Sequence, residues 1–423
     1  MCGQLWQLFS ASWFITYSKL PPTVEKKTLL TVSVILLLIL GGLFVFQVTK
    51  DITREITERE VARITQQEIG RITSEEIERI TDQRTQEITD GLLGGVSQAK
   101  DSACKLVPKQ REFSSTPYYT GPLLDAHVHM PVSSALVSAV AMQLGFEDMP
   151  TLGDIPVDHI ICVFDSEGIT ALFGFFLMPN VAIGQTVRTI KDAEERFPGK
   201  IITFFMPPPI HSINPEPGDV EEVLDDNAGL FRGYGEMAFE QGTFTEAHPE
   251  DPEFLEMYDL ADAHKLIVMM HPRADQKQAV ERILKSHPTT NFLLHGDGSQ
   301  AWIAQLMETY PNVYYSVDAT ITSIYWFAPQ HDDKGPTKEE WLAYFRQNFD
   351  SLLQNAVREW KPAIEAHPDR FLWASDRWYS WHFDYEVGGL IEEFGRSFIG
   401  QLDPVVQEKF AYQNAEKLAQ NSA

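Results

Sequence analysis

Short apolar stretches alternate with amphipathic segments along the last three hundred residues of the chain. We predict strands at residues 123–129, 159–165, 201–206, 231–237, 265–271, 290–295, 313–318 and 371–376. Strands that alternate with helices form parallel βαβ units, and a nearly continuous apolar stretch such as Ile201–Phe205 suits a strand buried on both faces. Eight such units predict an α/β fold, a (β/α)8 TIM barrel over residues 121–423, since this fold takes about 250 residues or more.

A second apolar pattern, without any charge, lies near the start of the chain at residues 28–48. At 1.5 Å per residue, a helix of this length matches the roughly 30 Å hydrocarbon core of a bilayer. A cleaved signal peptide is the alternative, but its apolar part spans only about 7–15 residues, and no small-x-small cleavage site follows here. We therefore predict a single-pass transmembrane helix, preceded by an N-terminal segment at residues 1–27. Basic residues flank both ends and do not decide the orientation; we favour a barrel on the non-cytoplasmic side.

Residues 50–90 contain an eight-residue repeat whose copies begin at Glu60, Glu68 and Glu76. The apolar positions of the repeat are Val61, Ile64, Ile69, Ile72, Ile77 and Ile80. Their mean spacing of 4.0 residues exceeds the helical period, which favours right-handed winding of associated helices. We predict a helical stalk that self-associates as a coiled coil and makes the protein a homo-oligomer. A single solvated helix or a flexible linker is the alternative, since Ile and Thr are indifferent helix formers. Glycines then end the pattern, and residues 91–120 are predicted to be a linker.

Side chains of the types that bind metals occur where several predicted barrel strands end. His127 and His129 form an HxH pair, and His271, His295 and Asp376 each end another apolar stretch. Because strand side chains alternate between faces, the two imidazoles of the HxH pair point to the same side. The carboxyl ends of barrel strands meet at one end of the barrel, where active sites lie. Imidazole and carboxylate ligands suit zinc, manganese or iron, so the set predicts a site for one or two divalent transition metal ions, with zinc favoured.

This pattern resembles the amidohydrolase superfamily, in particular its amidohydrolase-related and TatD-like branches, from about Gly121 onward. In that family an HxH pair closes the first strand, histidines close the fifth and sixth, and an aspartate closes the eighth. Gly233–Met237 looks like the glutamate version of the fourth-strand ligand, and Tyr412–Leu418 is similar to the closing helix. The resemblance implies a metal-ligand set of His127, His129, Glu236, His271, His295 and Asp376.

The resemblance also implies roles for individual ligands. Asp376 is expected to be the general base for a metal-activated water. His295 is expected to be catalytic, as a ligand, as a group that orients a ligand, or as a proton-transfer group. Glu236 is expected to bridge two metals, to bind one, or to make a structural hydrogen bond. The sequence Asp376-Arg377-Trp378 departs from the family's common aspartate-x-proline, so we expect a different loop shape there.

Residues near these ligands are candidates for orienting them or for binding substrate. Asp125 shares the face of the HxH pair and is expected to orient one of the histidines. Arg273 is a candidate for gripping an anionic group of the substrate, with a surface salt bridge as the alternative. Trp378 and His382 belong to an aromatic segment that we expect to wall a partly apolar pocket.

Composition narrows the function further. The formal net charge of −26 excludes nucleic acid as a partner, because phosphates require clustered Lys and Arg. The three cysteines are widely separated, which indicates no disulfide framework, and Cys162 lies in the apolar stretch Ile160–Phe164 as an expected buried, inert thiol.

We therefore predict a membrane-anchored, metal-dependent hydrolase that acts on a small-molecule substrate. A metal-dependent, non-oxidative decarboxylase of the same branch is a second interpretation, favoured if Glu236 is not a ligand. A non-enzymatic, oligomeric stalk protein with an inactive barrel is a third, which the intact ligand set disfavours.

Overall fold

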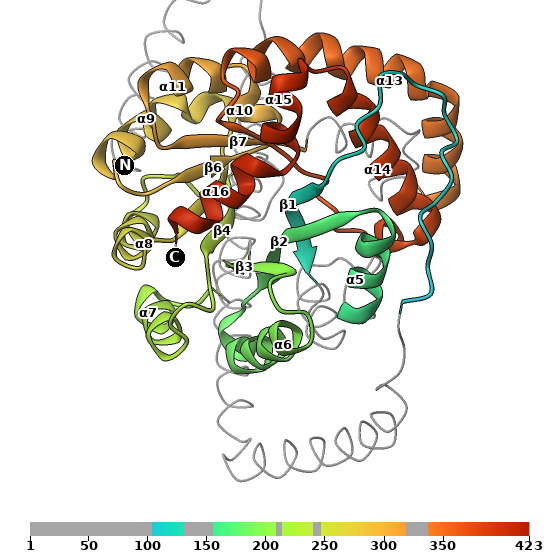
Figure 1. Ribbon diagram of the computed structural model, residues 1–423. Coiled ribbons are helices and arrows are strands. Elements are labelled where there is room, and N and C mark those ends of the chain that lie inside the picture. The colour runs from blue at the N-terminus through green and yellow to red at the C-terminus, as the bar shows by residue number, and fades with distance from the viewer. Residues whose placement is uncertain (1–103, 131–154, 209–213, 240–246, 319–336, 423) are drawn as a thin grey trace, which may run out of the picture. The chain divides into compact units, whose positions relative to one another are not determined.

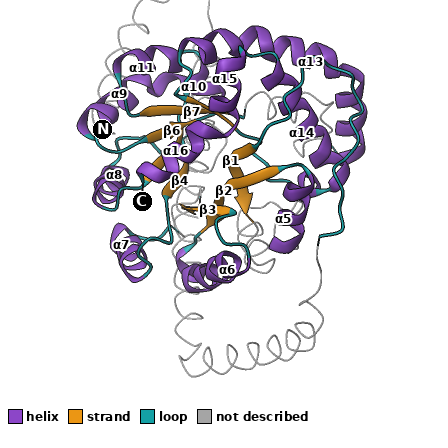
Figure 2. Cartoon of the chain, viewed as in Figure 1, coloured by secondary structure: helices purple, strands orange, loops and turns teal. Residues whose placement is uncertain are grey.

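The computed structural model describes residues 104–130, 155–208, 214–239, 247–318 and 337–422. Within these ranges the strands form one parallel eight-stranded sheet in chain order, with helices outside it (Figures 1 and 2). The strands are β1 Leu123–Met130, β2 Ile169–Leu177, β3 Ile201–Met206, β4 Gly233–Ala238, β5 Ile267–His271, β6 Phe292–Leu294, β7 Val313–Val317 and β8 Phe371–Trp373. The segment after β8 closes the ring on β1, because the N–H of Asp376 donates to His127 and the N–H of His129 donates to Arg377. The predicted TIM barrel is confirmed.

The longer helices are α5 Val157–Ser166, α6 Ile183–Arg196, α7 Pro217–Asp226, α8 Pro252–Ala263, α9 Lys277–Ser286, α11 Ile303–Thr309, α13 Lys338–Ala366, α14 Tyr385–Gly400 and α16 Asn414–Asn421. Short elements connect them: η2 Asn180–Ala182, η4 Ala274–Gln276, α10 Asp297–Gln300, η6 Ser380–Phe383, α15 Pro404–Glu408 and the π-helical η7 Lys409–Gln413. None of the helices in the described ranges is long and apolar enough to span a bilayer. The transmembrane helix predicted at 28–48 and the stalk predicted at 50–90 lie outside the described residues.

The strand predicted at residues 159–165 is wrong, because this stretch belongs to helix α5 and the second strand is β2. Its buried residues include Ile160, Ile161 and Phe164, which recur at the spacing of one helix face. Gly168, with φ of +72°, then turns the chain into β2. A short, apolar helix buried on one side therefore has the composition of a buried strand.

The barrel interior is a separate apolar cluster. Phe173, Phe175 and Phe204 fill it with smaller side chains from the other strands, and Leu418 of α16 packs onto it. In Figure 1, α16 lies in front of the sheet, at the end of the barrel where the strands begin. Because the chain's own C-terminal helix covers the N-terminal ends of the strands, the opposite end is the one at which the predicted ligands meet.

Residues 104–119, here called the strap, run along α13 and α14 into β1 (Figure 1). The Glu393 carboxylate accepts the backbone N–H groups of Glu112 and Phe113 at 2.8 Å each. The Phe113 ring stacks on Phe349 at 3.8 Å between centroids. Much of the segment predicted to be a linker is therefore packed against the barrel, and the compact unit begins at Ala103.

A disulfide joins Cys104 of the strap to Cys162 of α5. The expectation of an inert Cys162 thiol is therefore wrong. The reason is the helix: Ile161 and Val163 are buried, while Cys162 between them is only partly buried and reaches the strap.

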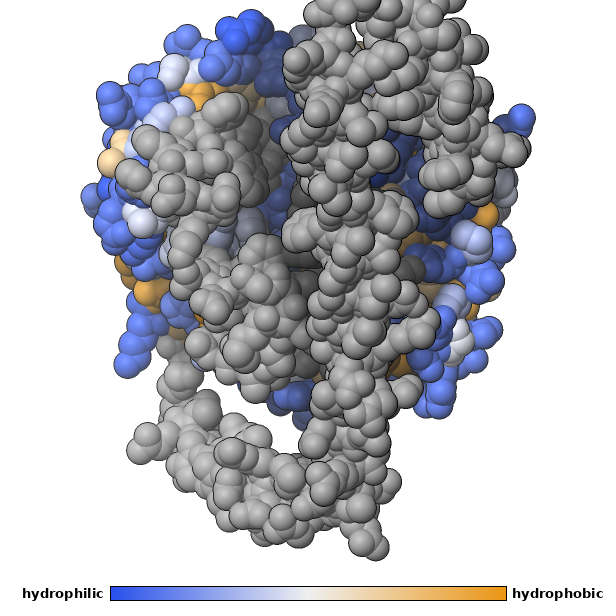
Figure 3. All heavy atoms as spheres, turned by 180° about the vertical axis from the view of Figure 1, so that it is seen from behind, coloured by the Kyte–Doolittle hydropathy of each residue, from blue (hydrophilic) through white to orange (hydrophobic). Residues whose placement is uncertain are grey.

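The described surface is mainly hydrophilic in the view of Figure 3, which agrees with the strongly acidic composition. Among the described residues, the large apolar side chains that remain exposed are Val107, Leu255 and Val405. They are scattered over the strap, α8 and α15.

Candidate metal centre

The predicted ligands come together at the C-terminal end of the barrel. They lie at or near the ends of five different strands: His127 and His129 in β1, Glu236 in β4, His271 in β5, His295 after β6 and Asp376 after β8. Parallel strands deliver their C-terminal residues to one end of a barrel, so residues separated by some 250 positions become neighbours.

The Glu236 carboxylate lies at the centre of four histidines of the described part of the chain. Its Oε1 atom is 2.7 Å from His295 Nε2 and 3.0 Å from His271 Nδ1. Its Oε2 atom is 3.4 Å from His127 Nε2 and 3.5 Å from His129 Nε2. Four ring nitrogens, delivered by β1, β5 and the end of β6, therefore surround one carboxylate group.

Asp376 adds a second carboxylate next to the HxH pair. Its Oδ1 atom is 3.1 Å from His129 Nε2 and 3.5 Å from His127 Nδ1. The residue has φ of +50°, a left-handed conformation that costs an ordinary residue roughly 1–2 kcal/mol. The backbone bonds of Asp376 and Arg377 to β1 stabilise this turn, which keeps the carboxylate beside the two histidines.

Asp318, directly after β7, is a member of the cluster that was not predicted from the sequence. Its Oδ2 atom is 3.1 Å from His127 Nδ1 and 3.2 Å from His295 Nδ1. A signal exists in the sequence, because Asp318 also follows a buried apolar strand, as His295 and Asp376 do.

Gly296 makes room for His271. A Cβ atom at this position would lie 2.0 Å from His271 Nε2, and Gly296 has φ of +81°. Only glycine meets both the conformation and the space at this point.

The electrostatics of the cluster favour the charged forms of four of its members, Glu236, Asp318, His127 and His295. Burial opposes ionisation of Glu236 and Asp318, but the positive charge of His295 and hydrogen bonds from the histidines hold both pKa values well below the ordinary range. Burial likewise opposes protonation of His127, but the charge of Asp376 and the neighbouring carboxylates of Asp318 and Glu236 raise its pKa to about 9. The pKa of His295 is raised well above its ordinary value, against the effect of burial, by the charges of Glu236 and Asp318.

The donor atoms fit a divalent transition metal. Two groups of three residues have ligand atoms within 4.8 Å of one another: His127, Glu236 and His295, and His127, His129 and Asp376. His127 Nε2 is fully buried and has no hydrogen-bond partner among the described residues, an arrangement that costs free energy unless a ligand completes it. Imidazole nitrogens with carboxylate oxygens are the set that zinc, manganese and iron share.

Asp125 supports the cluster through the backbone. Its carboxylate accepts the N–H of Ser375 at 2.9 Å and the N–H of His127 at 3.3 Å. Burial raises its pKa to about 6, although Arg377 and the hydrogen bonds from Ser375 act in the opposite direction. Its side-chain contacts tie β1 to the residues after β8, and its contact with His127 is to the backbone N–H and not to the ring.

Arg377 is completely buried and forms a bidentate ion pair with Glu167, at 3.0 and 2.7 Å. Its guanidinium also lies over the Phe164 ring, 4.6 Å from the centroid. Arg377, which lies between Asp376 and the Trp378 that stands where the family commonly has proline, therefore anchors the loop after β8 to α5.

The predicted substrate-binding residues are held by contacts within the protein. Arg273 donates to the carbonyls of Phe239 and Ala247 and to the Asp275 carboxylate. The ion pair with Asp275 corresponds to the alternative of a surface salt bridge. His382 Nδ1 accepts the N–H groups of Trp378 and Tyr379, and burial keeps the pKa of its ring well below the ordinary value.

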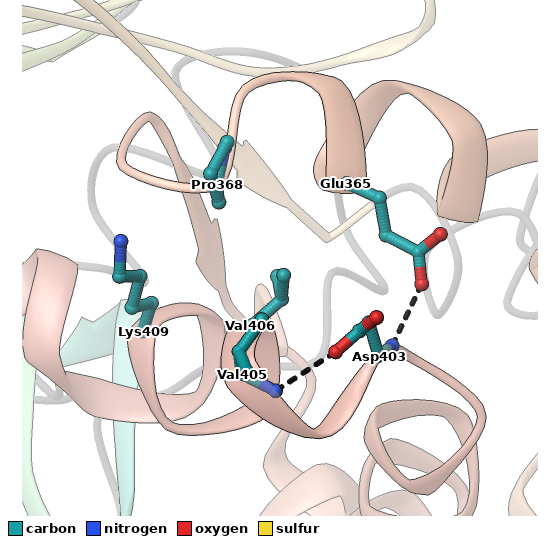
Figure 4. Close-up of a pocket in the computed structure, with 6 residues that line it drawn as sticks. All are labelled: Glu365, Pro368, Asp403, Val405, Val406 and Lys409. Carbon is teal, nitrogen blue, oxygen red and sulfur yellow. Dashed lines mark hydrogen bonds between the residues drawn. The ribbon is translucent and has the colours of Figure 1, made fainter.

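A pocket of about 300 Å³ lies away from these ligands, between the end of α13 and the short helix α15 (Figure 4). Glu365, Asp403 and Lys409 line it, and Glu365 accepts the backbone N–H of Asp403. Because Pro368 in its wall precedes β8, the pocket lies at the N-terminal end of the strands, opposite the histidines.

Comparison with known proteins gives a family match. A family model described as amidohydrolase matches residues 177–418, more than half of the chain. No curated protein matches the chain.

Several solved structures are similar at low identity. A putative 2-pyrone-4,6-dicarboxylic acid hydrolase from Pseudomonas putida is 16% identical, with a TM-score of 0.45 over 71% of this chain and 98% of that one. An amidohydrolase from Burkholderia multivorans is 15% identical, with a TM-score of 0.44 over 71% and 99%. A 2,6-dihydroxybenzoate decarboxylase is 15% identical, with a TM-score of 0.39 over 71% and 99%. At these values the likeness carries no argument about substrate.

Proposed function

Because the chain belongs to the amidohydrolase family, we propose that it is a membrane-anchored, metal-dependent hydrolase acting on a small-molecule substrate. The observation that supports this proposal is the convergence of four histidine nitrogens on Glu236, within 3.5 Å, with Asp376 beside them. Such a set is an improbable result of packing alone, because burying each charged or polar group costs free energy unless the group is paired or binds a metal.

The residues that would hold the metal are His127, His129, Glu236, His271, His295 and Asp376. A bound zinc, manganese or iron ion supplies positive charge that polarises a substrate oxygen and acidifies water. Glu236 decides the number of ions, because its two oxygens face different pairs of histidines. If Glu236 is a metal ligand the residues would hold two ions, and if it only accepts hydrogen bonds from the histidines they would hold one.

Asp376 is the general base of the proposal. Its side chain is 14% exposed, whereas that of His127 is completely buried, so a water molecule can reach the carboxylate. An ionised carboxylate accepts the proton of an attacking water and returns it to the leaving group, provided that both lie within hydrogen-bond reach. His129 Nε2 lies 3.1 Å from Oδ1 of Asp376, so these two groups would approach the same metal ion.

The second candidate is a non-oxidative decarboxylase. One observation favours it: Glu236 already makes short contacts, at 2.7 and 3.0 Å, with His295 and His271. A carboxylate used in this way orients histidines and leaves one metal position at the HxH pair and Asp376.

The proposed setting of the enzyme is a membrane with the barrel on the non-cytoplasmic side. The anchor is residues 28–48, and residues 50–90 would join copies into a homo-oligomer. The Cys104–Cys162 disulfide supports the orientation, because disulfides persist in oxidising compartments and are rare in the cytosol.

Metal analysis of the full-length chain tests the proposal. The protein would be stripped with a chelator and reconstituted with zinc, manganese or iron, and the bound metal counted per chain. Two ions support the hydrolase with a bridging Glu236. One ion that Glu236→Gln also retains supports the decarboxylase.

A matched control separates the site from other histidines. His287 is also paired with a carboxylate, Asp259 at 3.0 Å, but lies at the end of α9. His127→Gln should lower metal occupancy and His287→Gln should not. A folded wild-type protein that takes up no metal would contradict the proposal.

A further inference from the structure

Asp318 contacts two of the proposed ligands through one oxygen atom. Its side chain is 1% exposed, and Oδ2 lies 3.1 Å from His127 Nδ1 and 3.2 Å from His295 Nδ1. Ser316, two residues earlier and on the same face of β7, donates its hydroxyl to the same oxygen at 2.9 Å. Three groups from three strand ends therefore meet at one carboxylate oxygen.

These contacts determine which nitrogen of each ring faces the metal site. An ionised carboxylate only accepts hydrogen bonds, so a ring nitrogen that contacts it carries a proton. If Nδ1 keeps its proton on both histidines, Nε2 is the atom that would give up its own proton and offer a lone pair to a metal. These Nε2 atoms are the ones that lie 3.4 and 2.7 Å from Glu236.

The two imidazoles are also placed relative to each other. Their centroids are 4.6 Å apart and their planes meet at 85°. Because β1 and β6 are not neighbours in the sheet, no ladder of backbone hydrogen bonds fixes this arrangement directly. Asp318 connects the two rings across the barrel.

We propose that Asp318 is a positioning residue that holds His127 and His295 with both Nδ1–H groups on its Oδ2 atom and both Nε2 atoms directed at the metal site. Its effect on metal binding rests on the proposed function, but the arrangement of the two rings does not. It acts through the histidines and is not itself a metal ligand. The aspartate predicted from the sequence for this task, Asp125, instead contacts Ser375 and the backbone of His127.

Nuclear magnetic resonance of the full-length chain, labelled with ¹⁵N only in its 12 histidines, tests the arrangement. In the zinc-free wild type, the strongly downfield-shifted Nδ1–H resonances should include a pair of which one is lost in His127→Gln and the other in His295→Gln, in addition to the resonance expected from His271 Nδ1 beside Glu236. Both should disappear in Asp318→Asn. The matched control is Asp125→Asn, which removes an equally buried carboxylate with no histidine ring on it and should keep both resonances.

Zinc binding gives the second readout. In the zinc-loaded wild type both Nδ1–H resonances should persist, since the metal takes Nε2. Asp318→Asn should weaken zinc binding about 10- to 100-fold in a chelator competition, the range typical of groups that orient a ligand.

The outcomes separate the two proposals. The positioning role is overturned if the zinc-free wild type lacks the downfield pair, if Asp318→Asn retains it, or if zinc loading removes either Nδ1–H. Should the pair be present while zinc does not bind, the positioning role stands and the metal-dependent function fails. The wild-type spectra decide the question even if Asp318→Asn does not fold.

Discussion

Replacing Gly296 by alanine should damage the metal site far more than it damages the fold. The new Cβ would lie 2.0 Å from His271 Nε2 and 2.3 Å from Cδ2, whereas ordinary contact begins at about 3.4 Å. The ring must therefore shift by about 1.4 Å, which disturbs the 3.0 Å contact between its Nδ1 atom and Glu236. A displaced ligand should cost at least the roughly 10- to 100-fold in metal affinity that follows from losing a group that merely orients one.

The backbone adds a separate cost, and the chain offers a variant that isolates it. Gly296 has φ of +81°, and alanine in a left-handed conformation costs roughly 1–2 kcal/mol. Gly199, between α6 and β3, has φ of +73°, and nothing lies within 4 Å of the point that a Cβ atom would occupy there. Gly199→Ala should therefore lose a similar free energy of unfolding without any change at the metal site.

The assay compares the two variants by chemical unfolding and by chelator competition for zinc. Similar losses of unfolding free energy, with weakened zinc binding only in Gly296→Ala, would support the reasoning. Equal zinc affinities in the two variants would refute it, because His271 would then tolerate the displacement or take no part in binding.

Asp376→Asn should abolish turnover of any substrate that a hydrolase screen identifies, with little change in unfolding free energy, whereas His127→Ala should also lower metal occupancy; near wild-type activity of Asp376→Asn would remove it from the mechanism. The metal-free protein should lose stability as the pH rises from about 6.5 to about 9, and unfolding curves across this interval check it. The reason is that the pKa of His127 is raised from 6.5 to about 9 in the folded protein, so its protonation stabilises the fold fully below pH 6.5 and no longer does so once the pH has passed the folded value. Cys104→Ser should lower the unfolding free energy by at most about 4 kcal/mol, the chain-entropy value for a loop of 58 residues, and an unchanged denaturation midpoint would show that the other strap contacts suffice. Serine at Ile69, Ile72, Ile77 and Ile80 together should dissociate the predicted oligomer in sedimentation without changing metal binding; a wild-type chain that sediments as a monomer would make the stalk a spacer.

The fold, and the residues that gather at the C-terminal end of the barrel, can be predicted from sequence wherever a buried strand ends in a polar side chain. That pattern depends only on strand alternation and on the parallel arrangement, so it indicates His127, His271, His295 and Asp376 without any knowledge of contacts. Asp318 satisfies the same rule. It does not stand out in the sequence because carboxylates are common after strands, and only its distances to two histidines distinguish it.

Other features depend on tertiary contacts that produce no periodic pattern in the sequence. Helix α5 has the sequence pattern of a strand because apolar residues dominate a segment only 10 residues long. The pairing of Cys104 with Cys162 joins a segment with no regular secondary structure to a helix, across 58 positions of sequence. Neither spacing nor composition indicates such a pairing.

The disulfide gives the strap a mechanical role. Any pull on the chain from its N-terminal side enters the barrel unit at Cys104, and the covalent bond passes that tension directly into α5. Residues 105–119 contact the barrel through hydrogen bonds and ring stacking, and the disulfide prevents a pulling force from breaking these contacts one after another. Since the strap leads straight into β1, the bond also keeps such tension from His127 and His129.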